Sequence, residues 1–318
     1  MDALFLLLGL GLILGGAHFL TDGAAALAQR FRVPEFIIGL TVIAIGTSTP
    51  ELVVSVLSAV GGKSDMAIGN VVGSNLFNTL VIVGVCALIR PLPLSRENIR
   101  RDIPCGAAAA LLLLAFASRG LLHPGDGRID RIEGVAMLLL YIGSMIWTIH
   151  LAARSGAAAN EKAQPSQPLQ NPWITGMMIV GGLAALIYGG DLFLDRATSI
   201  ARKWGVSESV IAITLVAGGT SLPELAASVF SMLKGKSDMA LGNVLGSNIA
   251  NILLILGASA TIRPLATAGI TAADLGMVVL SSLLLLLTAF TFRRGSVDRW
   301  EGALFLAIYA AYIGYLLR

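Results

Sequence analysis

The chain carries two closely similar copies of one 39-residue stretch. Gly46–Gly84 aligns without a gap with Gly219–Gly257 at a constant offset of 173 residues (219 − 46), and 25 of the 39 pairs are identical. The same offset relates residues outside the stretch, such as Asp22 and Asp195. Similarity at one fixed spacing indicates an internal duplication, so the fold must be built from two related halves.

Apolar residues dominate the composition. The 318 residues are 56% hydrophobic and 13% charged, whereas a soluble globular protein is about a quarter charged. Apolar runs of roughly 18 or more residues can cross the hydrocarbon core of a bilayer, so we predict a polytopic membrane protein. We interpret the first run as a membrane helix rather than a cleaved signal peptide. The ten predicted spans are 3–20, 34–60, 66–89, 103–118, 132–151, 173–194, 206–233, 239–262, 270–292 and 300–317.

The duplication and the spans together predict the fold class. Each copy holds five spans, and an odd number places the second copy in the membrane with the opposite orientation. We therefore expect an all-α membrane protein with ten transmembrane helices, arranged as two inverted five-helix repeats. The predicted parts are a first repeat at 1–154, a polar linker at 155–172 and a second repeat at 173–318. Lys and Arg are slightly more numerous on the linker side, which predicts a cytoplasmic linker and both termini outside.

Each copy places a glutamate in the middle of an apolar span. Glu51 lies in GTSTPE, midway along 34–60, and Glu224 lies in GTSLPE, midway along 206–233. A carboxylate at this depth is costly, and its default interpretation is functional. The sequence places no Lys or Arg at comparable depth in any predicted span, which argues against a purely structural ion pair.

A proline precedes each of these glutamates. Pro50 and Pro223 lack a backbone N–H and clash with the carbonyl four residues earlier, at Gly46 and Gly219. Broken helix at this depth is tolerated where it is buried in protein or lines a cavity. We therefore expect loosened carbonyls beside each carboxylate, together with side-chain hydroxyls. The hydroxyl residues that precede the prolines are Thr47, Ser48, Thr220 and Ser221.

The following span in each copy carries a polar stripe. GNVVGSNLFN at 69–78 spaces an Asn, a Ser and an Asn by four residues, and GNVLGSNIAN at 242–251 repeats the pattern. Residues four apart share one face of a helix, and the adjacent glycines allow another backbone to approach closely. We expect the stripe to pack helices and to line the site, with the last two members of each triplet nearest to it. The stripe consists of Asn70, Ser74, Asn78, Asn243, Ser247 and Asn251.

These groups form an all-oxygen ligand set. Two carboxylates, several hydroxyls, amide oxygens and loosened carbonyls suit hard cations, and calcium takes about six to eight oxygen ligands. Two carboxylates balance the charge of one calcium ion or of two sodium ions. The pattern therefore predicts one midplane site at which the two ions exclude each other, as antiport requires.

The two repeats resemble the alpha-repeats of the calcium/cation antiporter superfamily, specifically its sodium/calcium exchanger branch with its potassium-dependent and prokaryotic members. The paired motifs GTSxPE and GNxxGSN carry the resemblance, which covers essentially the whole chain. It implies a multi-pass protein of the plasma membrane, the inner membrane of a prokaryote, that transports calcium and sodium by alternating access. The glycine-rich first and sixth spans resemble the sliding gate pair of the family.

The resemblance also implies a set of ion ligands. The glutamate of each motif is the central calcium ligand, the hydroxyls before the proline bind sodium and calcium, and a carbonyl seven residues before each glutamate binds sodium. The serine of GSN and the residue four positions later complete the set. The implied ligands are Glu51, Glu224, Thr47, Ser48, Thr220, Ser221, Ser74, Ser247, Asn78, Asn251, Ala44 and Ala217.

Alternatives remain at this stage. Asn251 stands where several family members carry an aspartate that is tied to potassium, which favours a potassium-independent cycle. A midplane glutamate could also carry a proton, so a proton-coupled antiporter of calcium or another divalent cation is the main alternative. The sequence shows no nucleophile–base pair or His-containing metal motif in both copies, and we expect neither an enzyme nor a cofactor. We infer no nucleic-acid partner and no obligatory protein partner, only the ions and the lipid bilayer.

Overall fold

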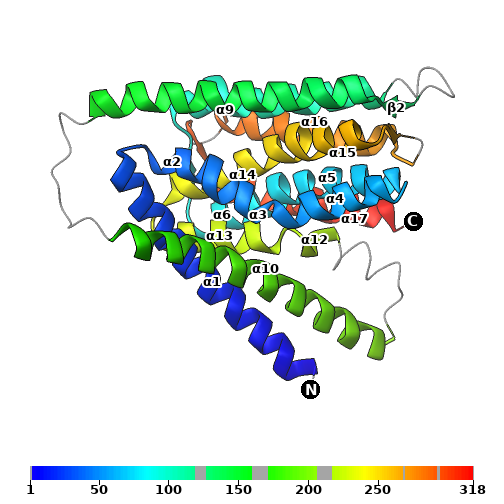
Figure 1. Ribbon diagram of the computed structural model, residues 1–318, viewed down its shortest axis with the longest axis horizontal. Coiled ribbons are helices and arrows are strands. Elements are labelled where there is room, and N and C mark those ends of the chain that lie inside the picture. The colour runs from blue at the N-terminus through cyan, green and yellow to red at the C-terminus, as the bar shows by residue number, and fades with distance from the viewer. Residues whose placement is uncertain are drawn as a thin grey trace. The chain divides into compact units, whose positions relative to one another are not determined.

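The computed structural model describes residues 2–118, 127–159, 171–205, 217–267, 269–291 and 294–317. Helix fills almost all of this part of the chain (Figure 1). The helices of the first half are α1 (Asp2–Phe31), α2 (Glu35–Ile38), α3 (Ala44–Thr47), α4 (Thr49–Val60), α5 (Ser64–Leu76), α6 (Val83–Ile89), α7 (Ile103–Ala117) and α9 (Arg131–Ala159). Those of the second half are α10 (Pro172–Lys203), α12 (Ala217–Gly219), α13 (Leu222–Leu233), α14 (Ser237–Ile249), α15 (Gly257–Ile262), α16 (Ala272–Thr288) and α17 (Arg299–Leu316).

Within the described residues, short π-helical segments interrupt the helical run at four places, where the chain winds more loosely than an α-helix. They are η1 (Gly39–Ile43), η2 (Phe77–Ile82), η3 (Asn98–Asp102) and η5 (Ala250–Leu256). Such segments occur frequently at functional sites. Asn78 lies in η2 and Asn251 lies in η5, so two predicted ligands fall in irregular helix that the sequence pattern did not predict.

Each of the ten predicted spans contains helix in the described residues. Among the residues that the structure describes, five helices are long and apolar enough to cross a membrane. A sixth span is formed if Glu35–Thr47 and Thr49–Val60 are counted together as one broken span. The inverted arrangement of the two repeats stays a prediction. Residues 206–216 of the seventh span and most of the predicted linker lie outside the described residues.

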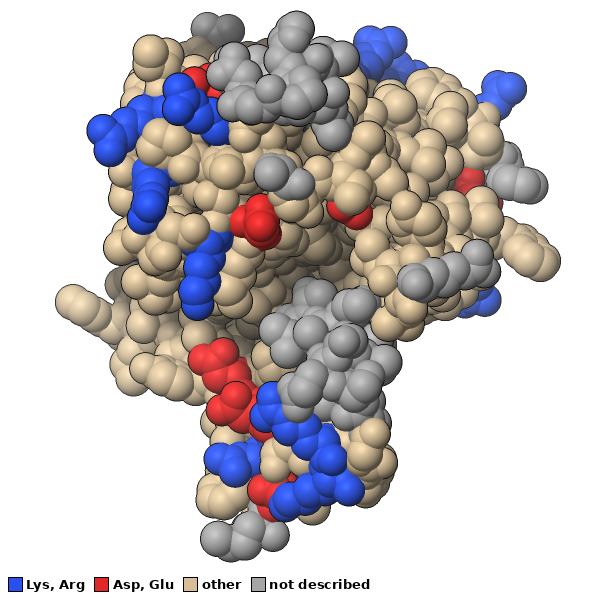
Figure 2. All heavy atoms as spheres, turned by 90° about the vertical axis from the view of Figure 1, so that its right-hand side faces the viewer, with Lys and Arg blue, Asp and Glu red and all other residues tan. Residues whose placement is uncertain are grey.

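Large apolar side chains are exposed along several helices, as expected where lipid replaces water. Leu4, Leu139 and Val180 each expose more than 60% of their surface. On the face in Figure 2, Lys and Arg gather in separate groups between wide areas of uncharged residues. This distribution fits charged anchors at the ends of apolar helices.

The chain divides into two compact units, and each takes helices from both copies of the duplication. Unit 1 comprises Met1–Thr47, Ser144–Gly246 and Ile313–Arg318, and unit 2 comprises Ser48–Gly143 and Ser247–Tyr312. The division therefore does not follow the boundary between the repeats.

Unit 1 is organised around α1 and α10, which pack along each other through glycines (Figure 1). A Cβ atom at Gly9 would lie 2.9 Å from the Gly189 carbonyl oxygen, and one at Gly16 would lie 2.8 Å from that of Gly182. The offset of 173 relates Gly9 to Gly182 and Gly16 to Gly189, so the two contacts are equivalent. Larger residues would force these backbones apart.

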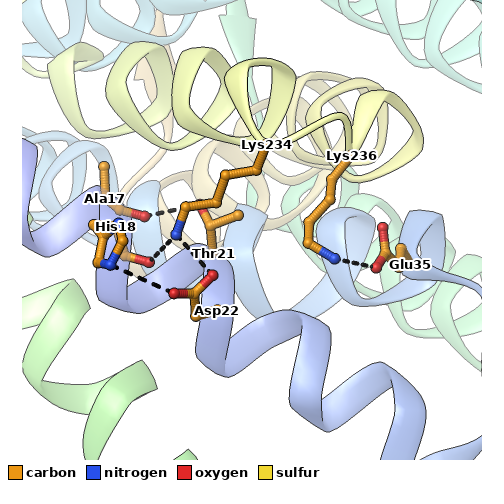
Figure 3. A network of polar contacts seen from close by, with 7 residues as sticks. All are labelled: Ala17, His18, Thr21, Asp22, Glu35, Lys234 and Lys236. Atoms are coloured by element: carbon orange, nitrogen blue, oxygen red, sulfur yellow. Dashed lines mark hydrogen bonds and ion pairs between the residues drawn. The ribbon is translucent and has the colours of Figure 1, made fainter. Parts of the chain in front are cut away.

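The turn between α13 and α14 is tied to α1 and α2 by two lysines (Figure 3). Lys234 donates to Asp22 Oδ1 (2.7 Å) and to the His18 carbonyl oxygen (3.0 Å), while Lys236 donates to Glu35 Oε1 (2.5 Å). All of these residues belong to unit 1. The contacts fix the second half of α1, and the start of α2, against the helices that carry the second copy of the motifs.

The described part of unit 2 contains the helical residues outside unit 1 and two short antiparallel ribbons. Strand β1 (Leu92–Pro93) pairs with β4 (Ser296–Val297), and β2 (Arg128–Ile129) pairs with β3 (Leu265–Ala266). Each ribbon joins a loop of the first half of the chain to a loop of the second half. Helix α4 packs against α5, α15 and η5, and η5 also packs against α5. These contacts surround the first glutamate.

Candidate functional site

Each glutamate motif lies where one helix ends and the next begins. The chain leaves helical geometry at Ser48 (φ −81°, ψ 8°) and at Ser221 (φ −90°, ψ 11°), and a new helix then begins with proline in its first turn. The predicted breaks at the two prolines are confirmed. Each glutamate consequently lies in the first turn of a helix, where unpaired backbone N–H groups favour negative charge.

In unit 2, Glu51 is fully buried beside α5. Ser74 Oγ lies 3.5 Å from Glu51 Oε1, and Asn70 Nδ2 donates to the Glu51 backbone carbonyl oxygen (3.2 Å). The same Asn70 amide donates to Ser55 Oγ (3.0 Å), and Ser55 in turn donates to the Ala67 carbonyl oxygen (3.3 Å). This closed set of contacts fixes α4 against α5 and holds the main chain of Glu51.

In unit 1, Glu224 is also fully buried and is held in the same way by α14. Asn243 Nδ2 donates to the Glu224 backbone carbonyl oxygen (3.2 Å) and to Ser228 Oγ (2.9 Å). Because Asn243 and Ser228 are the duplicates of Asn70 and Ser55, the network occurs twice with equivalent residues. Each unit thus contains a buried glutamate whose backbone carbonyl accepts a hydrogen bond from an asparagine amide. That amide is half-buried at Asn70 and fully buried at Asn243.

Unit 2 also contains three predicted ligands that are buried without a hydrogen-bond partner among the described residues. They are the amide groups of Asn78 and Asn251 and the hydroxyl of Ser247. A buried polar group that lacks a partner costs about 1–3 kcal/mol, and native structures rarely leave such groups unexplained. Oxygen atoms of this kind are suitable ligands for a hard cation.

In unit 1 the remaining predicted ligands lie on α3 and around α12 and α13. Thr47 is fully buried, and its hydroxyl lies near the carbonyl oxygens of Ile43 (3.1 Å) and Ala44 (3.4 Å) and near Asn243 Oδ1 (3.3 Å). Ser221 is fully buried and Thr220 is half-buried. Ala217 begins α12, and its side chain lies outside the described part.

The twelve predicted ligands therefore fall into two groups of six. Unit 2 holds Ser48, Glu51, Ser74, Asn78, Ser247 and Asn251, and unit 1 holds Ala44, Thr47, Ala217, Thr220, Ser221 and Glu224. Within the described residues no group of three or more His, Cys, Asp or Glu side chains is placed to hold a metal ion. The candidate oxygens are thus mainly hydroxyls, amides and carbonyls, with one predicted carboxylate ligand in each unit.

Sequence reasoning missed the role of Asn70, Asn243, Ser55 and Ser228. The two asparagines were recognised as stripe members but were placed farther from the site than the serines that follow them. The two serines end the motif GTSxPELxxS in both copies. Their exact repetition, seven residues after Ser48 and Ser221, was the available signal.

Comparison with known proteins adds an independent line of support. The profile described as sodium/calcium exchanger protein matches residues 1–150 and 174–318. The chain is 36% identical to the putative antiporter CaxA of Alkalimonas amylolytica, over 98% of this chain and 96% of that protein. It is 32% identical to the sodium/calcium exchanger MaX1 of Methanosarcina acetivorans, over 98% of this chain and 97% of that protein.

A solved structure of similar fold is that of the sodium-calcium exchanger NCX_Mj soaked with sodium and calcium. It superposes with a TM-score of 0.81 at 32% identity and covers 98% of this chain and 97% of that one. The similarity therefore extends over nearly the full length of both chains.

Proposed function

Because the chain belongs to the sodium/calcium exchanger family, we propose that it is a secondary active antiporter that exchanges calcium for sodium across a membrane by alternating access. The family consists of transporters, so the chain is not an enzyme. One observation carries the proposal above the others. A fully buried glutamate on a restarted helix occurs twice, and each is held by the same Asn and Ser pair.

Glu51 and Glu224 are the principal calcium ligands in this proposal. Ionised carboxylates that are buried in a membrane protein are costly unless a partner compensates them, and a calcium ion supplies two positive charges against their two negative charges. The surrounding hydroxyl, amide and carbonyl oxygens complete the coordination that calcium requires. The amides of Asn78 and Asn251 and the hydroxyl of Ser247 support this assignment because they are buried and lack partners among the described residues.

Sodium binds in competition with calcium at overlapping ligands. In the proposal the Ala44 and Ala217 carbonyl oxygens and the hydroxyls of Thr47 and Thr220 serve sodium, with one ligand pair in each repeat. Two sodium ions neutralise the two carboxylates, and exchange of more than two sodium ions for one calcium ion would move net charge across the membrane. Asn251 adds no charge, which supports a cycle that does not require potassium.

The two faces of the membrane are reached in turn by movement of α1 and α10 against the ligand helices. Their close glycine contacts support a pair that moves as one body. We place the protein in the inner membrane of a prokaryote with the linker in the cytoplasm and both termini outside, as the distribution of Lys and Arg favours.

Uptake of radioactive calcium into proteoliposomes tests the proposal. Vesicles are loaded with sodium, potassium or choline, and a separate set carries only a proton gradient. Uptake that requires internal sodium is the expected result. Uptake that a proton gradient drives equally well, without any response to sodium, contradicts the proposal and assigns the protein to proton-coupled exchange.

A further inference from the structure

The side chain of Asn243 joins the two glutamate motifs within unit 1. Its amide group donates to the Glu224 carbonyl oxygen (3.2 Å), while its Oδ1 lies 3.3 Å from the Thr47 hydroxyl. Thr47 belongs to the first repeat and Glu224 to the second. All three residues are at least 99% buried, so water does not compete for these contacts. One amide thus connects a proposed sodium ligand to the main chain of a proposed calcium ligand.

The hydroxyl of Thr47 has one hydrogen and three acceptors within reach. Two are carbonyl oxygens of its own helical run, Ile43 (3.1 Å) and Ala44 (3.4 Å), and the third is Asn243 Oδ1 (3.3 Å). A hydroxyl hydrogen that points at the Ala44 carbonyl occupies a lone pair and presents positive charge to any ion there. A hydrogen that points at Asn243 leaves both the Ala44 carbonyl and the Thr47 oxygen available to a cation.

The position of Asn243 is fixed rather than adjustable. Its amide is held by Glu224 and by Ser228 Oγ (2.9 Å), so its Oδ1 must face the opposite way. The helix that carries Asn243 also lies close to the helix of Thr47. A Cβ at Gly246 would be 2.3 Å from the Leu40 carbonyl oxygen, which leaves the two backbones no space for a larger side chain.

From these contacts we propose that Asn243 is a positioning residue for sodium binding. Its Oδ1 accepts the hydroxyl hydrogen of Thr47, so the Ala44 carbonyl oxygen stays available to bind sodium. Its amide group also bonds to the Glu224 carbonyl oxygen, so the Thr47 hydroxyl is coupled to the main chain of that glutamate. This inference rests on the proposed exchange of sodium and calcium. It assigns to Asn243 an effect on sodium that is larger than its effect on calcium, because the Thr47 and Ala44 oxygens are the groups it controls.

The test measures half-saturation of exchange by sodium and by calcium in reconstituted protein. Asn243→Leu keeps the branched shape of the side chain but removes its acceptor and its donor, and Thr47→Val removes the hydroxyl. Loss of one hydrogen bond to a buried group corresponds to a rise of about three- to tenfold in the sodium concentration for half-saturation. The calcium half-saturation is expected to change less. Asn70→Leu removes the equivalent bonds to Glu51 and Ser55 in the first copy, and so measures how much loss of this main-chain support alters exchange.

A double variant separates positioning from packing. If Asn243 acts through the Thr47 hydroxyl, Asn243→Leu adds little to the sodium defect of Thr47→Val, so the two effects do not multiply. If the effects multiply, or if Asn243→Leu changes calcium and sodium half-saturation equally, the inference is wrong. Should Asn243→Leu fail to reach the membrane, Asn243→Ala removes the same groups and carries the same expectations.

Calcium uptake by the wild-type protein shows whether a negative result overturns this inference alone or also the proposed function. Absence of sodium-driven calcium uptake in the wild type overturns the proposed function and this inference with it. Normal wild-type uptake with an unchanged sodium half-saturation in the Asn243 variants overturns this inference alone.

Discussion

The helix pair α4–α5 in unit 2 and the helix pair α13–α14 in unit 1 come from duplicate sequences and have kept the same polar network. Each pair holds the main chain of a buried glutamate with an asparagine amide and a serine hydroxyl. They differ in what surrounds that network. In the second pair, Lys234 ties the following turn to α1, whereas the duplicate position is Gly61. The two copies therefore share the hydrogen bonds that hold the glutamate main chain. They differ in the contacts that join the neighbouring turn to other helices, such as that of Lys234 with Asp22.

The comparison teaches where the two copies can specialise. A network that fixes the ligand main chain tolerates little change, because each buried donor and acceptor needs its partner. Contacts at the ends of helices are partly exposed and contribute less. We therefore expect substitutions in the shared network to have large effects that are similar in the two copies. Substitutions at the contacts that only one copy makes should have small effects.

The largest effect is expected at the glutamates. Glu51→Gln and Glu224→Gln each remove one negative charge from the proposed ligand set, so sodium-driven calcium uptake should fall to the level of protein-free vesicles in both. The matched control is Glu301→Gln, because Glu301 is buried in unit 2 but bonds to the loop residues Thr291 and Asp298. An active Glu51→Gln beside an inactive Glu224→Gln would show that the two copies are not equivalent.

Adding a third carboxylate tests why the stripe residues Asn78 and Asn251 are both amides. Asn251→Asp should leave an uncompensated negative charge in the site at neutral pH. Calcium uptake should therefore fall in medium that contains choline, and should be partly restored when potassium replaces the choline. The measurement is calcium uptake at fixed sodium with either cation present. Asn78→Asp is the duplicate substitution. Indifference of both variants to potassium contradicts the assignment of these amides to the ion site.

A smaller effect, on stability, is expected for the hydrogen bond between Asn248 and Thr79, for which the other copy lacks the hydroxyl. Asn248 Nδ2 donates to Thr79 Oγ1 (2.8 Å), but Thr79 is replaced by Ile252 in the other copy. Thr79→Val should lower the free energy of unfolding by about 1 kcal/mol, as for a buried hydrogen bond. Thermal unfolding in detergent measures it, and Thr79→Ser, which keeps the hydroxyl, should lose less. Equal losses in both variants would assign the effect to packing.

The smallest effect is expected for the lysine attachment. Lys234→Gly gives the second copy the residue of the first and removes the ion pair with Asp22. Both side chains are partly exposed, at 21% and 37%, so the stability change should be about 1 kcal/mol or less. Added salt should reduce the difference between wild type and variant further. A loss as large as that of Thr79→Val would mean that this contact matters more than its exposure indicates.

Much of the architecture could be predicted because its signals are local. Apolar runs predicted ten spans, each of which contains helix in the described residues, and the prolines predicted the helix breaks beside Ser48 and Ser221. Each of these follows from residue type and spacing alone.

The rest depends on contacts between distant parts of the chain. No residue pattern marks η2 and η5 as π-helical, so the irregular setting of Asn78 and Asn251 was not predicted. The amides of Asn70 and Asn243 were not selected because each bonds to the main-chain carbonyl of a glutamate, a contact that has no sequence signature. The division into two units also cuts across the repeats, because each unit is defined by contacts in space and not by the duplicated sequence.

The central claim is that both duplicated glutamates bind the transported ion. Equilibrium binding of radioactive calcium to the purified protein tests it most directly, with sodium as competitor and with Glu51→Gln and Glu224→Gln beside the wild type. We predict saturable calcium binding that sodium displaces in the wild type and that is lost in each variant. Calcium binding that survives in either folded variant with unchanged affinity would contradict the account.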